Sequence, residues 1–338
     1  MSRKSSTREG DLSVHHSPGA GEARGGGGAN PGRDADTPRE IPARGWLQVT
    51  KRAWKESSED QVPLLAAGVA FKAFLALFPA VTAAFLLWGL VGDTAQIKDQ
   101  IDGVAAIPAE ARSLVTSQID AIAANQSAAG WSIVIAVALA LFSASSGVQN
   151  LMAATNIAYD EKETRGFVKI KGTALVLTVG AIVFVLLGIA LIGVVPVVAS
   201  ALGLDGVVGV LVGIVRWVLL LGVVVVALGV VYRVAPDRDA PKVRWLSTGA
   251  VVATLLFLLV SVGFSLYVTL AGGSSYAKNY GALAGVVILL MWLWLTSYAI
   301  LLGAEINAEA EKQTEHDTTV GQPEPMGSRR ANAADTTA

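Results

Sequence analysis

The sequence predicts an all-α polytopic membrane protein with six transmembrane helices and both termini in the cytoplasm. Hydrophobic residues make up 53% of the 338-residue chain and charged residues only 16%, whereas soluble domains have about 25% charged residues. Six apolar stretches each reach the roughly 20 residues needed to cross a bilayer. Basic residues gather in alternate connections between these stretches, as the positive-inside rule requires of a multi-pass protein.

The six stretches are apolar on nearly all faces, which favours membrane helices over amphipathic surface helices. Pro79 lies in the first stretch and is expected to kink it. The fourth stretch contains Arg216 and has two possible starts, one near Val207 and one near Trp217. The later start would leave residues 203–215 as a re-entrant or surface element. The stretches are residues 62–92, 131–152, 172–200, 207–232, 245–270 and 281–304.

Charge sets the expected orientation. The connections on one side of the predicted membrane carry 13 basic residues, and those on the other side carry three, Lys98, Arg112 and Lys278. Cytoplasmic loops carry the excess of Lys and Arg. The richer side is therefore predicted to be cytoplasmic. Its basic residues are Arg44, Lys51, Arg52, Lys55, Lys162, Arg165, Lys169, Lys171, Arg233, Arg238, Lys242, Arg244 and Lys312.

The polar segments outside the spans complete the predicted organisation. Residues 1–44 are rich in Gly, Ser, Pro, Arg and Asp, so we expect a disordered cytoplasmic tail without a signal peptide. Residues 313–338 are also expected to be a disordered cytoplasmic tail, which leaves 45–312 as the transmembrane domain. The extracytoplasmic segment 93–130 has helical apolar spacing. It is interpreted as two short helices at the membrane surface, or alternatively as a lid over a cavity.

The composition rules out cysteine chemistry and argues against most hydrolases, nucleases and metalloenzymes. The chain has no cysteine, and its three histidines, His15, His16 and His316, lie in the polar tails. The sequence has no phosphate-binding loop motif, and the acidic residues at 160–163 alternate with bases. We therefore expect no enzymatic activity, no cofactor and no metal. The net charge of −1 also argues against a nucleic-acid partner.

Polar residues within the spans are the candidate functional residues, because burying them in lipid is costly. Lys72 in the first span either extends to the inner headgroups or faces a polar cavity. Gln149 and Asn150 follow a small-residue run at the end of the second span. They either serve packing and interfacial solvation or form the polar floor of a central cleft.

The remaining candidates lie in the fourth and sixth spans. Arg216 is either well inside the membrane or an outer interfacial anchor beside Trp217. Glu305 and Glu309 share one helical face near the end of the sixth span, where paired carboxylates can do acid–base work, bind a cation or lie exposed. Asn307 lies between them. The predicted polar cavity consists of Lys72, Gln149, Asn150, Arg216, Glu305 and Asn307.

Five sets of residues are distinctive in their order and spacing along the chain. They are residues 66–80, 156–160 with Glu163, Arg165 and Phe167, 232–237, 279–283 and 302–307. Together these segments resemble the YihY/BrkB family of virulence factor BrkB-like integral membrane proteins, which carry the older label ribonuclease BN. The resemblance covers residues 45–312. At position 72 the family commonly has Tyr where this chain has Lys.

The resemblance implies a bacterial inner-membrane protein with six helices. Some family members were once labelled ribonuclease BN, and others have been linked to serum resistance or to tolerance of altered envelope lipid. We expect this protein to move a lipid or amphipathic molecule, or to assist its movement, with membrane lipids as partners. The alternative is a non-transporting scaffold that affects envelope integrity. Convergence of the candidate residues on one membrane-open groove would favour transport, and separate positions at the headgroup layers would favour the scaffold.

The predicted orientation can be tested by cysteine labelling, because the chain has no native cysteine. A cysteine placed at Ser113 is expected to react with an impermeant maleimide from the extracytoplasmic side of intact cells or oriented vesicles. Labelling that requires the inner leaflet to be opened would contradict the orientation.

Overall fold

The computed structural model describes residues 31–91, 129–204, 206–272 and 281–337, and every secondary-structure element in these ranges is a helix. The predicted extracytoplasmic segment lies outside the described residues except for its last two positions. The all-helical class predicted from composition is confirmed for the described part. The principal helices are α1 (Ala43–Glu59), α2 (Val62–Val91), α5 (Ala129–Ala158), α6 (Phe167–Ile189), α7 (Val195–Ala201), α8 (Gly206–Val234), α9 (Val243–Tyr267) and α11 (Ala284–Glu311).

Short elements extend these helices. The π-helical turn η3 (Ala190–Val194) joins α6 to α7, so that residues 167–201 form one apolar span. The π-helical turn η4 (Val268–Gly272) follows α9, and the 3-10 turn η5 (Gly281–Leu283) precedes α11. The other two elements lie near the chain ends. They are η1 (Pro38–Glu40) and α12 (Asn332–Asp335).

The helix lengths support a multi-pass membrane protein. Five described helices are long and apolar enough to cross a bilayer, and the number rises to six if the bent pair α1–α2 counts as one span. α8 runs without interruption from Gly206, so the earlier of the two predicted starts is correct. Arg216 then lies ten residues into the helix, about 15 Å from its beginning at 1.5 Å per residue.

α1 and α2 meet at a bend of 67°. Gln61 occupies the bend with a φ of 54°, a left-handed conformation that ends one helix and redirects the chain. α1 is amphipathic, and its buried face of Gly45, Val49, Ala53 and Ser57 packs mainly against α11.

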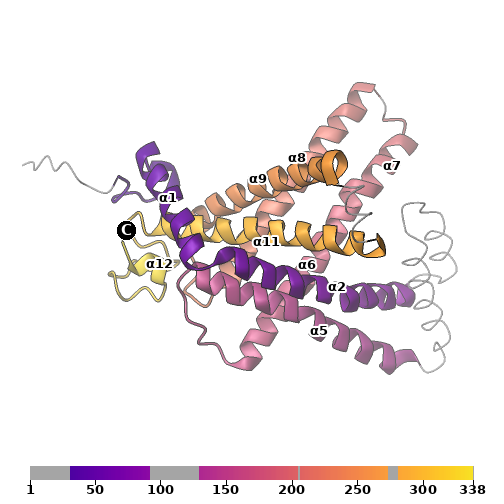
Figure 1. Cartoon of the computed structure of the whole chain (residues 1–338), viewed down its shortest axis with the longest axis horizontal. Coiled ribbons are helices and arrows are strands. Elements are labelled where there is room, and N and C mark those ends of the chain that lie inside the picture. The colour runs from indigo at the N-terminus through magenta and orange to yellow at the C-terminus, as the bar shows by residue number, and fades with distance from the viewer. Residues whose placement is uncertain (1–30, 92–128, 205, 273–280, 338) are drawn as a thin grey trace, which may run out of the picture.

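The helices form two groups (Figure 1). α2, α5 and α11 pack along one another, and α9 packs closely on α11. α6 and α8 contact each other and join this group through α5 and α9. Toward the end opposite the C-terminus, α7 and the adjoining part of α8 diverge from α2 and α5.

The last third of α11 is the most enclosed part of the fold. Every residue from Gly303 to Glu311 is buried. Ile306 and Ala310 pack with α1 and Trp245, whereas Ala304 and Ala308 pack with α8 and α9. We call this region the closed end, comprising residues 303–311 of α11, α1, and the linkers 159–166 and 235–242.

The crossing of α9 and α11 depends on small residues. The backbone N–H of Gly249 donates a 2.7 Å hydrogen bond to the Asn307 side chain, whose amide donates in turn to Leu246 O at 3.4 Å. A Cβ atom on Gly249 would collide with the carbonyl of Gly303 and with Asn307. The two glycines therefore allow the backbones to approach until the Asn307 side chain of α11 can form both of its hydrogen bonds to α9.

The C-terminal segment differs from the expected disordered tail. Residues 313–337 fold over the closed end, and Thr314, Thr318 and Arg329 are buried. Arg329 donates hydrogen bonds to the carbonyls of Ala334 and Glu315 at 2.6 and 2.8 Å. Thr314 bonds to the carbonyl of Ala35, so residues 31–44 are also folded here. Composition fails to predict this because polar contacts, rather than apolar burial, hold the segment.

Replacing Gly249 with Ala is expected to destabilise the protein by about 1–3 kcal/mol, the usual cost of overpacking. Gly263→Ala in the same helix is the control, because a Cβ there meets nothing within 4 Å. Thermal unfolding of both variants in detergent measures the difference. Equal melting temperatures for the two variants would contradict the close crossing.

Candidate functional site

The six residues predicted to share a polar cavity do not all lie together: Lys72, Gln149 and Asn150 lie on the adjacent helices α2 and α5, Glu305 and Asn307 on α11, and Arg216 on α8. Lys72 is exposed on α2, whereas Gln149 and Asn150 are partly buried on α5. The Asn150 amide nitrogen lies 3.4 Å from the position that a Cβ of Gly68 would occupy, which directs this side chain toward α2. Of the five best-defined pockets in the described part, one contains a member of the predicted set, Arg216.

Arg216 is partly buried in an apolar hollow of about 260 Å³ between η3, α7 and α8. Its guanidinium carbon lies 5.6 Å from the centroid of the Trp217 ring. The hollow is lined by Leu191, Val195, Val208, Leu211, Val212, Val215, Arg216 and Leu219. Because the other lining residues are aliphatic, Arg216 is the polar feature of this hollow.

Asn307 and Glu305 are both buried in α11 but differ in their contacts. Asn307 connects α11 to α9 through the two hydrogen bonds described above. Glu305 is only 2% exposed, and its Oε1 atom has no hydrogen-bond partner within the described part of the chain. Asn307 is therefore a packing residue, whereas the Glu305 carboxyl is unexplained by packing.

A second buried glutamate, Glu311, pairs with Arg238 from the α8–α9 linker. Their closest atoms are 2.6 Å apart and both side chains are completely buried. The hydroxyl of Thr318 donates a 2.6 Å hydrogen bond to the same carboxylate. The Arg238 guanidinium carbon also lies 5.0 Å from the Tyr159 ring centroid. These contacts join α11, both linkers and the C-terminal segment.

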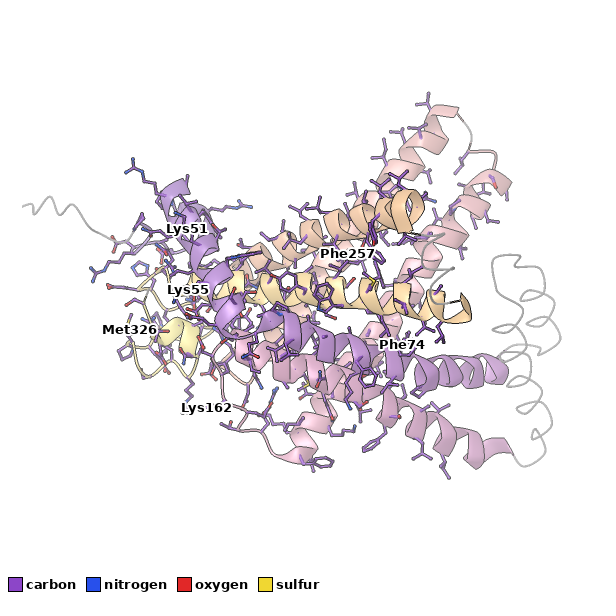
Figure 2. The ribbon with its side chains drawn as sticks, viewed as in Figure 1. Lys51, Lys55, Phe74, Lys162, Phe257 and Met326 are labelled. Atoms are coloured by element: carbon purple, nitrogen blue, oxygen red, sulfur yellow. The ribbon has the colours of Figure 1, made fainter. Side chains whose placement is uncertain are left out.

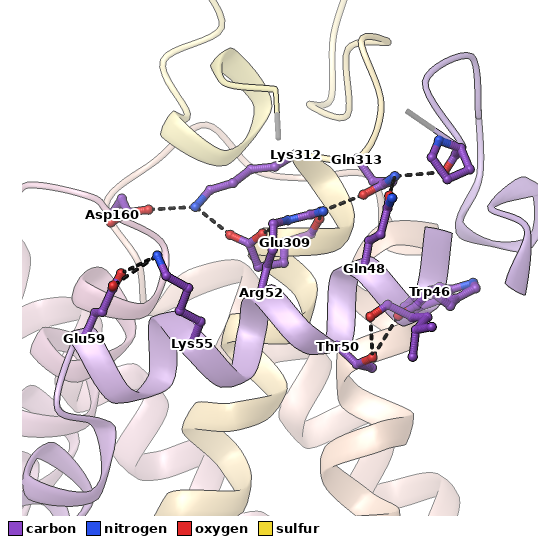
Figure 3. Close-up of polar contacts among 12 residues, drawn as sticks. Trp46, Gln48, Thr50, Arg52, Lys55, Glu59, Asp160, Glu309, Lys312 and Gln313 are labelled. Atoms are coloured by element: carbon purple, nitrogen blue, oxygen red, sulfur yellow. Dashed lines mark hydrogen bonds and ion pairs between the residues drawn. The ribbon is translucent and has the colours of Figure 1, made fainter. Parts of the chain in front are cut away.

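The third buried glutamate, Glu309, has two cations (Figure 3). Arg52 of α1 approaches to 2.6 Å and Lys312 to 2.7 Å, and Lys312 also contacts Asp160 at 2.9 Å. Burial acts to lower the pKa of Lys312, but Glu309 and Asp160 outweigh it and raise the pKa above its usual value. The charge of Lys312 is therefore shared between two carboxylates.

The two linkers are also bonded to each other. Arg165 forms a 2.7 Å ion pair with Glu163 and donates to the carbonyl of Ala235 at 2.8 Å. Asn156 donates to Glu163 at 3.0 Å and accepts from the backbone N–H of Asp237 at 2.7 Å. These contacts fix the α5–α6 linker against the α8–α9 linker.

The largest apolar cavity among those found in the described part was not predicted from the sequence. It has a volume of about 410 Å³ and lies between α6, α8, α9 and α11. The hydroxyl of Thr296 is buried there without a hydrogen-bond partner. Phe257 of α9, labelled in Figure 2, is among the lining residues. The cavity is lined by Leu177, Gly180, Ala181, Phe184, Val224, Ala227, Leu228, Val230, Val231, Phe257, Trp292, Thr296 and Ile300.

The described structure is that of a polytopic helical membrane protein with a closed, ion-paired end and an apolar cavity at span level. The family model described as Virulence factor BrkB matches residues 53–326. The chain therefore belongs to the BrkB family. The segments that suggested this family in the sequence supply Asn156, Glu163, Arg165, Asp237 and Asn307, which make the contacts described above.

Individual relatives agree with the family assignment. The chain is 31% identical over 260 residues to the putative ribonuclease-like protein YfkH of Bacillus subtilis, covering 73% of this chain and 89% of the relative. It is 39% identical over 100 residues to a UPF0761 membrane protein of Alteromonas mediterranea, covering 28% of this chain and 33% of the relative. No solved structure matches the chain.

Replacing Arg238 with Ala is expected to destabilise the protein by about 3–5 kcal/mol, because Glu311 would remain buried without its cation. Arg33→Ala is the control, since the pair between Arg33 and Glu315 is solvent-exposed and worth about 0–1 kcal/mol. Thermal or denaturant unfolding of both variants measures the contrast. If Arg238→Ala lowers the unfolding free energy no more than Arg33→Ala does, the buried pair is unimportant for stability.

The stability of the protein is expected to depend on Asp60, in the link between α1 and α2. Burial and then the charge of Asp160 raise the pKa of Asp60 to about 6. The folded state therefore retains a proton that the unfolded chain releases at lower pH, and stability falls as pH rises from about 4 to 6. Asp60→Asn should raise stability at pH 8 by up to about 1 kcal/mol, since partial exposure limits the effect.

Melting temperatures of Asp60→Asn at pH 4 and pH 8 measure this effect, which should vanish at the lower pH. Glu59→Gln is the matched control, because the neighbouring Glu59 is exposed and paired with Lys55. If Asp60→Asn is less stable than the wild type at pH 8, ionisation of Asp60 does not destabilise the folded state, which contradicts the prediction.

Proposed function

We propose that this protein binds the hydrocarbon chain of a membrane lipid, or of a similar amphipathic molecule, and assists its movement within the bacterial plasma membrane. The observation that carries the proposal is the apolar cavity between α6, α8, α9 and α11. Its volume of about 410 Å³ lies within the roughly 300–1,000 Å³ typical of ligand pockets. Its apolar walls and single unpaired hydroxyl suit an alkyl chain better than a polar solute.

The position of Arg216 adds a headgroup contact to this proposal. The hollow around Arg216 and the apolar cavity both lie along the contact between α6–α7 and α8. Arg216 precedes the nearest cavity residue of α8, Val224, by eight positions, or about 12 Å along the helix. A guanidinium at this place would attract an anionic headgroup while the chain occupies the cavity. The proposed substrate class is therefore an anionic amphipath.

The alternative function is a non-transporting scaffold that maintains the envelope through other membrane components. The enclosed closed end favours this alternative, because a path across the whole membrane would require its ion pairs to separate. The separation of Arg216 on α8 from Lys72, Gln149 and Asn150 on α2 and α5 also favours it over a single polar channel. Both functions have membrane lipids, and no nucleic acid, as partners.

We do not extend the word ribonuclease in the name of the Bacillus relative to this chain. Within the described residues, no group of three or more His, Cys, Asp or Glu side chains is placed to hold a metal ion. The spans also contain no histidine or cysteine, the side chains most often used for acid–base or nucleophilic catalysis. The proposed role is therefore non-enzymatic.

Filling the cavity should slow lipid movement. Purified protein in liposomes is expected to accelerate the exposure of a fluorescent phosphatidylglycerol to external dithionite. Ala227→Phe, on the cavity wall, should reduce this acceleration at least several-fold. Val226→Phe is the matched control, because Val226 is the adjacent residue of α8 and is 66% exposed.

Acceleration that is equal for the two variants would remove the cavity from the mechanism. If the wild-type protein has no effect beyond that of protein-free liposomes, lipid movement is rejected in favour of the scaffold.

A further inference from the structure

Glu305 is exceptional among the buried glutamates of α11. Glu309 contacts two cations and Glu311 contacts one, at distances of 2.6–2.7 Å. Glu305 is as deeply buried as Glu309, each being 2% exposed, but its Oε1 atom has no partner in the described structure. It forms no ion pair with any described residue.

The packing around α11 indicates which groups Glu305 faces. Leu301, one turn earlier on the same face, packs in an apolar cluster with Val62 of α2 and Ala154 of α5. Glu305 lies one turn further along the same face of α11. It therefore faces the α1–α2 link, which contains Asp60 and precedes Val62, and the C-terminal end of α5, which follows Ala154 and leads to Asp160. The charges that act on Glu305 come from Asp60, Asp160, Glu309 and Lys312.

None of these groups is available to neutralise Glu305. Asp60, Asp160 and Glu309 are acidic, and Lys312 is already bonded to Asp160 and Glu309. Glu56 and Glu59 of α1 add further negative charge near Asp60. Arg52, the cation that α1 contributes, contacts Glu309. An ionised Glu305 would thus be a buried charge beside three acidic groups, and the one cation that acts on it, Lys312, is already shared between two other carboxylates.

We propose that Glu305 is a proton-binding site that exchanges with the solvent at the closed end through Asp60. Asp60 is partly exposed and therefore forms the outer member of the pair. A metal ion is a poorer occupant, because no group of three or more metal-ligating side chains lies together in the described residues. The proposal goes beyond the proposed function, since it holds whether or not the protein moves lipid.

Proton loss from Glu305 would act on the junction of α2, α5 and α11. A neutral Glu305 allows these helices to pack, whereas a carboxylate would lie beside Asp60 and Asp160 and repel both. Deprotonation would therefore favour separation of α2 from α11 next to the closed end. The site would couple proton binding to helix packing.

Infrared spectroscopy of the purified full-length protein in lipid nanodiscs tests the proposal directly. At pH 7.5 the spectrum should contain the C=O stretch of a protonated carboxylic acid, shifted in heavy water. Glu305→Gln should remove this band, whereas Glu315→Gln, which changes an exposed glutamate, should leave it. Loss of the band only in Glu305→Gln supports the site, and its persistence in that variant overturns it.

Thermal unfolding provides an independent readout. A folded state that retains a proton loses stability as pH rises, so the melting temperature of the wild type should fall between pH 7 and pH 10. Glu305→Gln mimics the neutral carboxyl and should reduce that fall. An unchanged fall overturns the proposal. A sodium site would give a different result: sodium chloride, but not choline chloride, would stabilise the wild type, and Glu305→Gln would abolish this stabilisation. That result overturns the proton-binding proposal in favour of a sodium site.

Discussion

The architecture depends on the burial of three carboxylates in one enclosed helix end. Residues 303–311 of α11 are covered on every side, and water is replaced there by apolar side chains from α1, α2, α5, α8 and α9. Ionised carboxylates tolerate such surroundings only when cations and hydrogen-bond donors compensate them. Arg52 and Lys312 compensate Glu309, and Arg238 compensates Glu311, whereas Glu305 has no ion-pair partner among the described residues. The carboxylates therefore determine which segments must meet.

This requirement distinguishes a specific end from a less tightly packed region along α6, α7 and α8. At the closed end, ion pairs, linker contacts and the folded C-terminal segment define one arrangement. Along α6, α7 and α8, by contrast, the contacts are aliphatic and leave hollows of about 260 and 410 Å³. Apolar packing against lipid or against a neighbouring helix differs little in free energy. Motions that admit a ligand are therefore easier along α6–α8 than at the closed end.

The apolar stretches were readable from the sequence because hydropathy over 20 or more residues depends on composition alone. Tertiary contacts were not readable in this way. The folded state of residues 313–337 depends on partners such as Ala35 and Glu161, which are distant in sequence. The candidate residues were chosen for polarity inside spans, which identifies Glu305 and Asn307 but not their different surroundings. The cavity is lined by small residues of different helices, Gly180 and Ala181 of α6 and Ala227 of α8, and no single stretch contains that information.

Thiol accessibility at Ala310 tests the central claim most directly. Ala310 is completely buried, and a cysteine introduced there would be the only thiol in the chain. A small membrane-permeant maleimide should leave Ala310→Cys unmodified in the folded protein and modify it fully after denaturation, whereas the exposed Ser58→Cys should react at once. Comparable rates for the two variants in folded protein would show that the end of α11 is open and would contradict the account.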